Sequence, residues 1–419
     1  MNRTQAPAFS QPKDLEIQLP VEIELENGAR LFWIKDIKDD SVKLDIEWCA
    51  GSKYQDKKLV ANFTNKLLLS GNDNWSGKEI ANEIDFYGGY IQHELDRDHA
   101  GMTLYGLVEN MSDIFNIFRK AMLACDFPAV EFEKERTVSL SRFKIETKKV
   151  KNRCRRKFNE SIFGEKSAYG QVAVETDFEA VSRADVKAFY KQYYLDATPT
   201  IFLVGNVDAT FIEQLREWTT ELGNFVPDFT KEALMQEKGK VHVPVKDAIQ
   251  TAVRVGRLMF DKNHPDYFKF QLLNTTLGGY FGSRLMANIR EDKGYTYGIG
   301  SGMSVMEHAA YFFIATEVAV EVKEETVNEI FKEIARLRTD LIPEDELAKV
   351  KNYMLGDFLR HADGAIAMME NFKNIHFNQL KTTYYSDFIQ AINDATAEDL
   401  RVVAQKYWNE DDLVVVTAG

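Results

Sequence analysis

Cysteine is scarce in this sequence, and the few cysteines present exclude a covalently cross-linked fold. Only three occur in 419 residues, at Cys49, Cys125 and Cys154. An odd number at wide spacing fits neither a disulfide framework nor a zinc knuckle. Apolar residues are abundant instead, at 45% of the chain with 28 Phe and 17 Tyr, which excludes a disordered or low-complexity protein. At this length we expect two or more compact units.

Long apolar runs are also missing. No stretch reaches the roughly 20 uncharged apolar residues of a membrane-spanning helix. The N-terminal segment has no apolar core for a signal peptide, and Asp14 and Glu16 argue against a transit peptide. We therefore expect a soluble cytoplasmic protein without a membrane partner.

Positive charge is in short supply. The formal net charge is −13, whereas a nucleic-acid surface needs a dense cationic stripe to displace phosphate counterions. One basic run, residues 148–157, has no interleaved aromatic side chains, and we interpret it as the solvated face of a helix. We expect no nucleic-acid partner.

What the chain does contain is an internal repeat. Residues 184–205 and 398–419 align without a gap at an offset of 214, so that Tyr193 corresponds to Tyr407. In both segments apolar residues spaced three and four apart predict a helix, and a closing run of β-branched residues predicts a buried strand. The chain is therefore interpreted as two copies of one plan.

Strand and helix signals in each copy favour an α+β fold. Residues 25–37 and 41–52 predict adjacent strands, the first with a turn at Asn27 and Gly28, and helix signals follow. Without regular single-helix crossovers, we expect an antiparallel sheet in each unit, with helices packed on one face. A segment rich in Gly, Pro and mixed charge separates the copies. The predicted organisation is an N-terminal unit over 1–225, a linker over 226–240 and a C-terminal unit over 241–419.

A second pattern stands in the C-terminal half, where residues 277–302 read LGGYFGSRLMANIREDKGYTYGIGSG. Phe281, Leu285 and Ile289 recur at four-residue helical spacing, Gly294 predicts the helix end, and a strand follows from Tyr295.

Arg290 and Tyr297 lie on either side of that helix end. Seven residues across a helix end and a strand start could bring both side chains to one cleft. Alternatively, Arg290 caps its helix, where a cation is favourable, and Tyr297 is a half-buried sheet residue. Spacing alone leaves both interpretations open and favours the second.

This string, together with LENGARLFWI at 25–34, GSKYQ at 51–55 and the duplicated layout, resembles the pitrilysin and insulinase family of zinc peptidases. Within that family it is similar to the two-subunit branch that includes mitochondrial processing peptidase. The resemblance implies two halves that close around an unfolded peptide. It also implies that Arg290 and Tyr297 reach the peptide bond at a zinc ion on the opposite half.

The zinc-binding helix of that family has lost its ligands here. Active members carry HxxEH, with a further zinc-binding glutamate some seventy residues later, and the matching positions in this chain are Asn62, Asn65, Lys66 and, within one residue, Arg142. Zinc requires imidazole, thiolate or carboxylate donors. Lys66 and Arg142 instead place two positive charges where a divalent cation would sit. We expect no metal and no cofactor in this chain.

One other histidine pair is a candidate metal site. His93 and His99 occur in HELDRDH, within a stretch whose period predicts one strand. Six residues of extended chain would put the two imidazoles about 20 Å apart, too far to share an ion. The remaining histidines are scattered singly.

The same stretch carries a further implication of the resemblance. The strand after Gly88 and Gly89 resembles the family's edge strand, which pairs with the substrate backbone as an added strand. The implied substrate-binding residues are Gly88, Gly89, Tyr90 and Gln92.

A chain that keeps the arginine and tyrosine but binds no metal retains only transition-state stabilisation. The resulting hypothesis is the non-catalytic subunit of a heterodimeric zinc endopeptidase, which is not a peptidase alone. Its partner would be a homologous zinc-bearing subunit, and its substrates unfolded peptides. The alternatives are a purely structural subunit and a stand-alone homodimeric peptide-binding protein.

Overall fold

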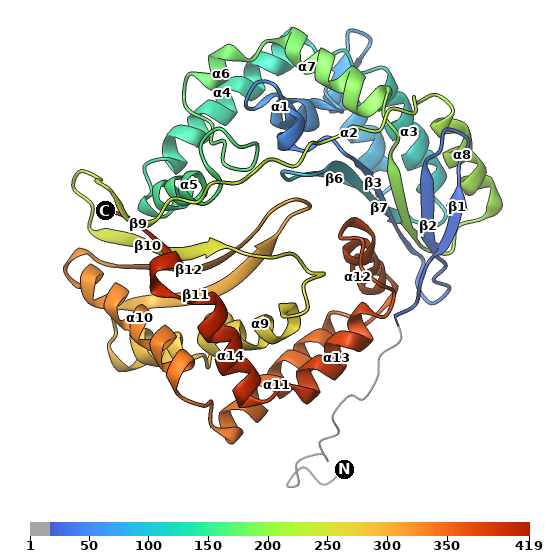
Figure 1. The fold of residues 1–419 in the computed structure, drawn as a ribbon. Helices are drawn as coiled ribbons and strands as arrows, with labels where there is room; N and C mark the ends of the chain where they lie inside the picture. Colours follow the sequence, from blue (N-terminus) through green and yellow to red (C-terminus); the bar gives the residue numbers. More distant parts are fainter. Residues whose placement is uncertain (1–16) are drawn as a thin grey trace. The chain divides into compact units, whose positions relative to one another are not determined.

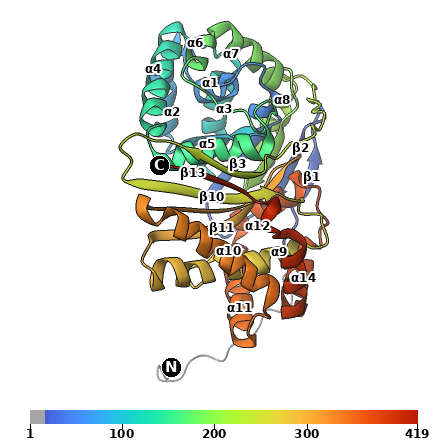
Figure 2. The ribbon, with the colours of Figure 1, turned by 60° about the vertical axis from the view of Figure 1, so that its left-hand side comes forward.

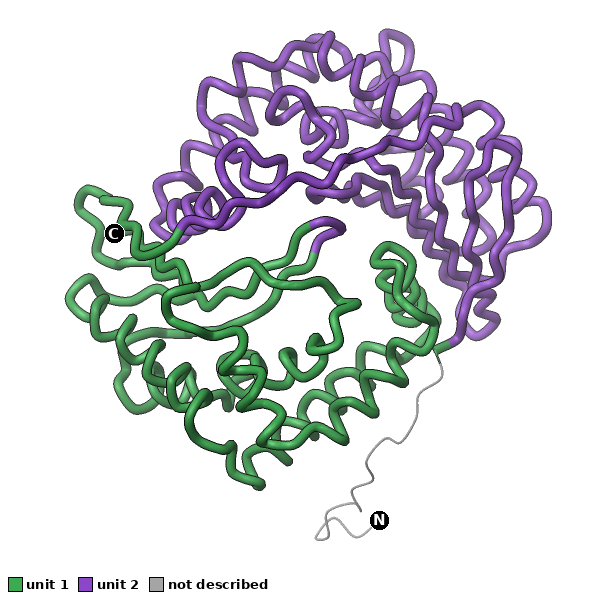
Figure 3. Tube along the Cα trace, viewed as in Figure 1, with its two compact units in different colours: residues 1–17, 238–305, 309–419 green, residues 18–237, 306–308 purple. Residues whose placement is uncertain are grey.

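The computed structural model describes residues 17–419 and divides the chain into two compact units (Figure 3). The N-terminal unit contains residues 18–237 and 306–308, and the described part of the C-terminal unit contains residues 17, 238–305 and 309–419. The chain passes from one unit to the other inside the segment expected as a linker, 226–240. Asp14 and Glu16, on which the targeting argument rested, lie outside the described residues.

The N-terminal unit is built on a six-stranded sheet. Its spatial order is β1-β2-β8-β3-β7-β6, and all neighbours are antiparallel except β2 and β8. The strands are β1 (Val21–Glu24), β2 (Arg30–Ile34), β3 (Ser41–Trp48), β6 (Tyr90–Leu95), β7 (Ala100–Leu107) and β8 (Thr200–Val204).

The predicted adjacency of the two strands in 25–37 and 41–52 is wrong. β8 lies between β2 and β3, parallel to the first and antiparallel to the second. The reason is burial: the run TIFLV of β8 is almost wholly buried, so its backbone donors and acceptors on both edges need hydrogen-bond partners, which β2 and β3 supply. The sheet is consequently mixed, with one parallel pair.

Helices cover one side of this sheet (Figures 1 and 2). Along β3 the even positions, such as Leu44 and Trp48, lie in the core, whereas Lys43 and Asp45 on the opposite face form an ion pair. Trp218 of α8 meets Trp48 edge-on at 6.3 Å. The helices are α1 (Val60–Leu67), α2 (Gly77–Phe86), α3 (Met111–Leu123), α4 (Ala129–Glu146), α5 (Val150–Phe163), α6 (Asp177–Ala180), α7 (Arg183–Tyr190) and α8 (Ala209–Thr219).

The C-terminal unit repeats this plan with five strands in the order β11-β12-β10-β13-β9. Only β13 and β9 are parallel. The strands are β9 (Gly239–Val243), β10 (Gln250–Leu258), β11 (Thr296–Val305), β12 (Ala310–Ala319) and β13 (Val414–Ala418). The helices are α9 (Tyr267–Asn274), η3 (Thr275–Gly279), η4 (Met286–Asp292), α10 (Lys323–Thr339), α11 (Glu344–Arg360), α12 (Ala365–Phe377), α13 (Tyr384–Asp394) and α14 (Ala397–Tyr407).

The repeat predicted from residues 184–205 and 398–419 is confirmed. α7 leads to β8 and α14 leads to β13, and each closing strand has one parallel and one antiparallel neighbour. The correspondence extends to the helix caps. Ser182 with Asp185 and Thr396 with Asp399 form capping boxes at the same offset of 214. The α+β class with two repeated units is therefore the observed architecture.

Neither a disulfide nor a transmembrane helix is present in the described part of the chain. None of the three cysteines is disulfide-bonded. No helix among residues 17–419 combines the length and apolar character needed to cross a bilayer.

Candidate functional site

The positions that match the zinc-peptidase motif lie on α1, beneath the sheet edge. Asn65 is buried, and its side-chain amide donates to the carbonyl oxygen of Gly101 at 3.2 Å and lies 3.5 Å from the Tyr194 hydroxyl. Asn65 therefore serves as a hydrogen-bonded core residue, joining α1 to β7 and to the segment after α7. Asn62 lies one turn earlier on the same helix and is half-buried.

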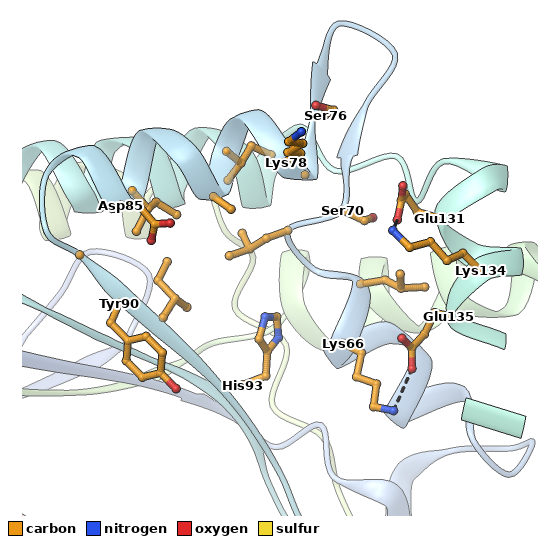
Figure 4. A pocket seen from close by; sticks show the side chains of 18 of the residues that line it. Lys66, Ser70, Ser76, Lys78, Asp85, Tyr90, His93, Glu131, Lys134 and Glu135 are labelled. Carbon is orange, nitrogen blue, oxygen red and sulfur yellow. Dashed lines mark hydrogen bonds and ion pairs between the residues drawn. The ribbon is translucent and has the colours of Figure 1, made fainter. Parts of the chain in front are cut away.

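Lys66 makes an ion pair across to α4. Its Nζ lies 2.8 Å from Oε1 of Glu135 and 2.8 Å from Oγ of Ser139 (Figure 4). The Ser139 hydroxyl donates to the same carboxylate. Glu135, Ser139 and Arg142 are spaced four and three apart, so they share one face of α4. Lys66, one of the motif positions on α1, is thus hydrogen-bonded within a network of side chains from α4.

The charge at this network differs from the expectation. Burial alone would raise the pKa of Glu135, but the hydrogen bonds from Lys66 and Ser139 and the positive charges of Lys66 and Arg142 outweigh it and lower that pKa. The sequence predicts two positive charges here, at Lys66 and Arg142, and the structure adds the carboxylate of Glu135, whose pKa both of them lower. The spacing of Glu135 and Ser139 along the helix was the signal that could have identified them.

A cavity of about 660 Å³ opens beside this network. It is lined by the end of α1, by α2, β6 and α4, and His93 points into it together with Lys66 and Glu135 (Figure 4). The Nδ1 of His93 lies 2.6 Å from the carbonyl oxygen of Asn65. Burial at the cavity wall lowers the pKa of His93.

His93 and His99 do not lie on one extended strand, because the chain turns between them. β6 ends at Leu95, and the amide of Asp96 donates to the carbonyl oxygen of His99 at 2.9 Å, closing a hairpin into β7. The one-strand interpretation was wrong. Within residues 17–419, however, no group of three or more His, Cys, Asp or Glu side chains is placed to hold a metal ion.

β6 lies at the edge of the sheet and pairs only with β7 among the described strands. Pairs alternate between hydrogen-bonded and non-hydrogen-bonded along an antiparallel ladder. Because the Asp96 and His99 pair is hydrogen-bonded, the backbone groups of Gln92 face β7 and those of Ile91 and His93 face outward. The edge therefore offers a row of backbone donors and acceptors.

The other predicted substrate-binding residues have distinct places around this edge. Gly88 adopts a left-handed φ of 68° in the turn from α2. Gly89 is buried, and a Cβ there would lie 2.9 Å from Ile84, so both glycines are required by the turn and its packing. Tyr90 is largely exposed, and Gln92 shares its face of the strand.

Arg290 and Tyr297 lie on adjoining elements of the C-terminal unit. Arg290 belongs to η4, and its guanidinium stacks 4.6 Å above the ring of Phe281. Gly294, with a left-handed φ of 64°, ends the helix as predicted. The expectation that Phe281 begins the helical face was wrong. Phe281 lies in a turn and is 65% exposed, because the helix starts only after it.

Tyr297 stands on β11, at the edge of its sheet. A register irregularity between Thr296 and Ile299 bulges the strand there, and the Tyr297 side chain is 95% exposed. The half-buried interpretation was wrong for this residue. Among the residues that the structure describes, neither Arg290 nor Tyr297 has an ion pair or a hydrogen bond through its side chain. Their polar groups are available to a ligand.

Comparison with known proteins gives a consistent picture. The family profile described as "Insulinase (Peptidase family M16)" matches residues 31–173, and "Peptidase M16 inactive domain" matches residues 180–354. The chain is 21% identical over 398 residues to "Uncharacterized zinc protease YmxG" of Bacillus subtilis. The matched region covers 92% of this chain and 95% of that protein.

Solved structures share the fold. A peptidase M16 inactive domain from Pseudomonas fluorescens matches with a TM-score of 0.86 at 23% identity, over 96% of this chain and 98% of that chain. A protease from Helicobacter pylori matches with a TM-score of 0.84 at 18% identity, over 96% and 100%.

Proposed function

Because the chain belongs to the insulinase family of peptidases, family M16, we propose that it is the non-catalytic subunit of a heterodimeric zinc endopeptidase. The partner is a homologous subunit that carries the zinc ion. This chain supplies Arg290 and Tyr297 to the scissile peptide bond and part of the surface that holds an unfolded peptide.

The observation that carries this proposal is the network of Lys66, Glu135 and Ser139. A zinc peptidase needs a metal to polarise the carbonyl group and activate water, and a carboxylate to take the proton. At the motif positions of this chain stand two amides and an ammonium group. The nearby carboxylate of Glu135 is already neutralised by Lys66 at 2.8 Å. These side chains do not fit zinc.

The second support is that the side chains of Arg290 and Tyr297 make no ion pair or hydrogen bond with other described residues. An arginine retained only to cap its helix or to form a structural ion pair would have a protein partner. Instead it rests on the exposed ring of Phe281, and Tyr297, on the adjoining strand, is 95% exposed. Cationic and hydroxyl donors of this kind stabilise the oxyanion that develops during peptide hydrolysis.

The proposal is tested by purifying the tagged chain from its native source. We expect a co-purifying partner of similar size that contains HxxEH, with stoichiometric zinc in the complex and none in this chain when it is expressed alone and washed. Elemental analysis measures both. Recovery of one tightly held transition-metal ion on the isolated chain, with peptidase activity, would overturn the proposal. A large assembly without HxxEH would favour the structural subunit, and recovery of the homodimer would favour the stand-alone peptide-binding protein.

The outward-facing backbone of β6 gives a separate prediction about peptide binding. A proline at His93 removes an amide donor that faces away from β7, a position where an edge strand tolerates proline. We expect His93→Pro to weaken binding of a fluorescein-labelled unstructured peptide by about 3- to 10-fold relative to His93→Ala, the range for one net hydrogen bond. Fluorescence anisotropy measures the difference.

The alanine variant is the matched control, because it removes the imidazole and keeps the amide. Gln92→Pro is the opposite control. Its amide faces β7, so this proline should lower the melting temperature instead. Equal peptide affinity of the His93→Pro and His93→Ala proteins would exclude β6 as a peptide-pairing strand.

A further inference from the structure

A second cavity, of about 500 Å³, lies wholly within the C-terminal unit and far along the chain from the motif positions. It is lined by side chains from the segment before α9 and from α9, α11, α12 and α13 (Figure 1). The volume is within the range of small-molecule sites. None of its lining residues belongs to the candidate site described above.

Lys262 is the feature of this cavity that needs explanation. Its Nζ donates to Oδ1 of Asn374, and within residues 17–419 no carboxylate lies within ion-pair distance of it. Oδ1 of Asn374 also accepts from the side chain of Asn378 at 3.1 Å, so this acceptor is shared. Lysines removed from water are normally paired with an anion. A half-buried ammonium group with only a neutral amide oxygen lacks its counter-charge.

The acidic group at the cavity does not supply that charge. Asp357 on α11 pairs with Arg360 and lies 3.5 Å from the imidazole of His361. Both of these partners are largely exposed, so this small cluster is at the rim and is satisfied there. The negative charge that would complete the surroundings of Lys262 must come from elsewhere.

The walls around Lys262 combine aromatic surface with neutral polar groups. Phe358 and Tyr385 are stacked at 5.2 Å with an interplanar angle of 11°, and Phe388 packs edge-on against Phe358 at 5.3 Å. The Tyr385 hydroxyl accepts from Asn374 at 2.9 Å and donates to the carbonyl oxygen of Asn371 at 3.3 Å. Such walls suit a flat or branched apolar group.

We propose that this cavity binds a carboxylate carried on an apolar body of aromatic size, with the carboxylate on Lys262 and the apolar body against Phe358 and Tyr385. The ligand is either a free carboxylic acid or the C-terminal residue of a peptide, which share this chemistry. The proposal does not depend on a zinc-bearing partner.

The cavity also predicts how binding depends on pH. Burial lowers the pKa of Lys262 to about 8. The other titratable groups that line the cavity are Tyr267, Tyr353, Tyr384 and Tyr385, with Asp357 and His361 at the rim. Burial raises the pKa values of Tyr267, Tyr384 and Tyr385, so these hydroxyls stay neutral. Carboxylate affinity should therefore be present below the pKa of Lys262 and fall as the pH rises through it.

The test is isothermal titration calorimetry with N-acetylphenylalanine and its uncharged amide. We expect the acid to bind at least about tenfold more tightly than the amide, as a charge-assisted hydrogen bond requires. Lys262→Met should abolish this preference. The matched control is Lys349→Met, which changes an exposed lysine of α11 that pairs with Asp345 and should leave the preference unchanged.

A peptide that ends in phenylalanine, with a free or an amidated C-terminus, distinguishes the two ligand sources. Tighter binding of the free-ended peptide than of N-acetylphenylalanine identifies a peptide terminus, and the reverse identifies a free acid. Equal affinity for acid and amide, or a preference that survives Lys262→Met, would overturn the proposal. If Lys262→Met fails to fold, the preference of the wild-type protein for the acid over the amide is measured from neutral pH to about pH 9 instead. A preference that does not fall over this range contradicts the role of Lys262.

Discussion

Replacing Arg290 with alanine is expected to lower peptide turnover by the reconstituted complex about 100-fold or more, while the complex still assembles. This is the size of effect seen when one donor to a developing oxyanion is removed. The fold should tolerate the change, since within the described residues the Arg290 guanidinium stacks on the exposed ring of Phe281 and makes no ion pair or hydrogen bond. Steady-state kinetics give the turnover, and size-exclusion chromatography reports the assembly.

Lys293→Ala is the control for charge. Lys293 lies three residues away, is exposed, and pairs at 3.5 Å with Glu329, so its loss should leave turnover nearly unchanged. Tyr297→Phe separates the hydroxyl from the ring and should lower turnover in the same direction as Arg290→Ala. Full turnover by the Arg290→Ala complex would remove the catalytic role and leave a scaffold.

Replacing Lys53 with methionine is expected to destabilise the N-terminal unit by about 3 kcal/mol or more, since breaking a buried ion pair strands a carboxylate. The Lys53 side chain is fully buried, with Asp98 at 3.2 Å and Glu307, which belongs to the same unit, in direct contact. The rings of Tyr54 and Phe229 each lie 4.9 Å from its Nζ. Chemical denaturation followed by tryptophan fluorescence measures the loss.

The pH dependence of this loss follows from Asp98. Burial would raise the pKa of Asp98, but hydrogen bonds from Tyr169 and the Glu307 amide, together with Lys53, lower it below the ordinary value. In the wild type this stability is present above the ordinary pKa of about 4 and is lost as the pH falls through the lowered value. Without Lys53 the buried Asp98 carboxylate loses its counter-charge, and protonation of Asp98 removes that unpaired charge. The difference in the free energy of unfolding between the wild type and Lys53→Met should therefore become smaller as the pH falls toward about 4.

The control for this experiment is Lys57→Met. Lys57 pairs with Asp185 at 2.8 Å, but its side chain is 52% exposed, and an exposed pair contributes less than about 1 kcal/mol. A Lys53→Met protein as stable as the Lys57→Met protein would show that the buried cluster does not stabilise the unit.

Several features of the protein were predictable because they depend on local pattern. The helix and strand of each repeat follow from apolar spacing, and the shared capping residues at Asp185 and Asp399 lie within the aligned segments. The end of η4 shortly before Gly294 follows from the backbone freedom of glycine. The lack of metal donors at Asn62, Asn65 and Lys66 is a matter of side-chain chemistry, which is read directly from the sequence.

The errors share a different cause. β8 lies between β2 and β3, although about 150 residues separate it from β3, because strand neighbours are chosen by burial across the whole sheet. Alternation of side chains alone predicted one strand through His99, but the strand ends at Leu95 and a turn follows. The pairing of Lys66 with Glu135 joins two helices whose packing no local pattern specifies.

The sequence by itself determined the duplicated α+β plan and the loss of zinc donors, since periodicity and side-chain chemistry act over a few residues. Only the tertiary structure decided which side chains pair with Lys66, which backbone groups of β6 face outward, and that the side chains of Arg290 and Tyr297 make no ion pair or hydrogen bond within the described residues. These depend on which distant segments meet, and long-range packing of buried surface settles that.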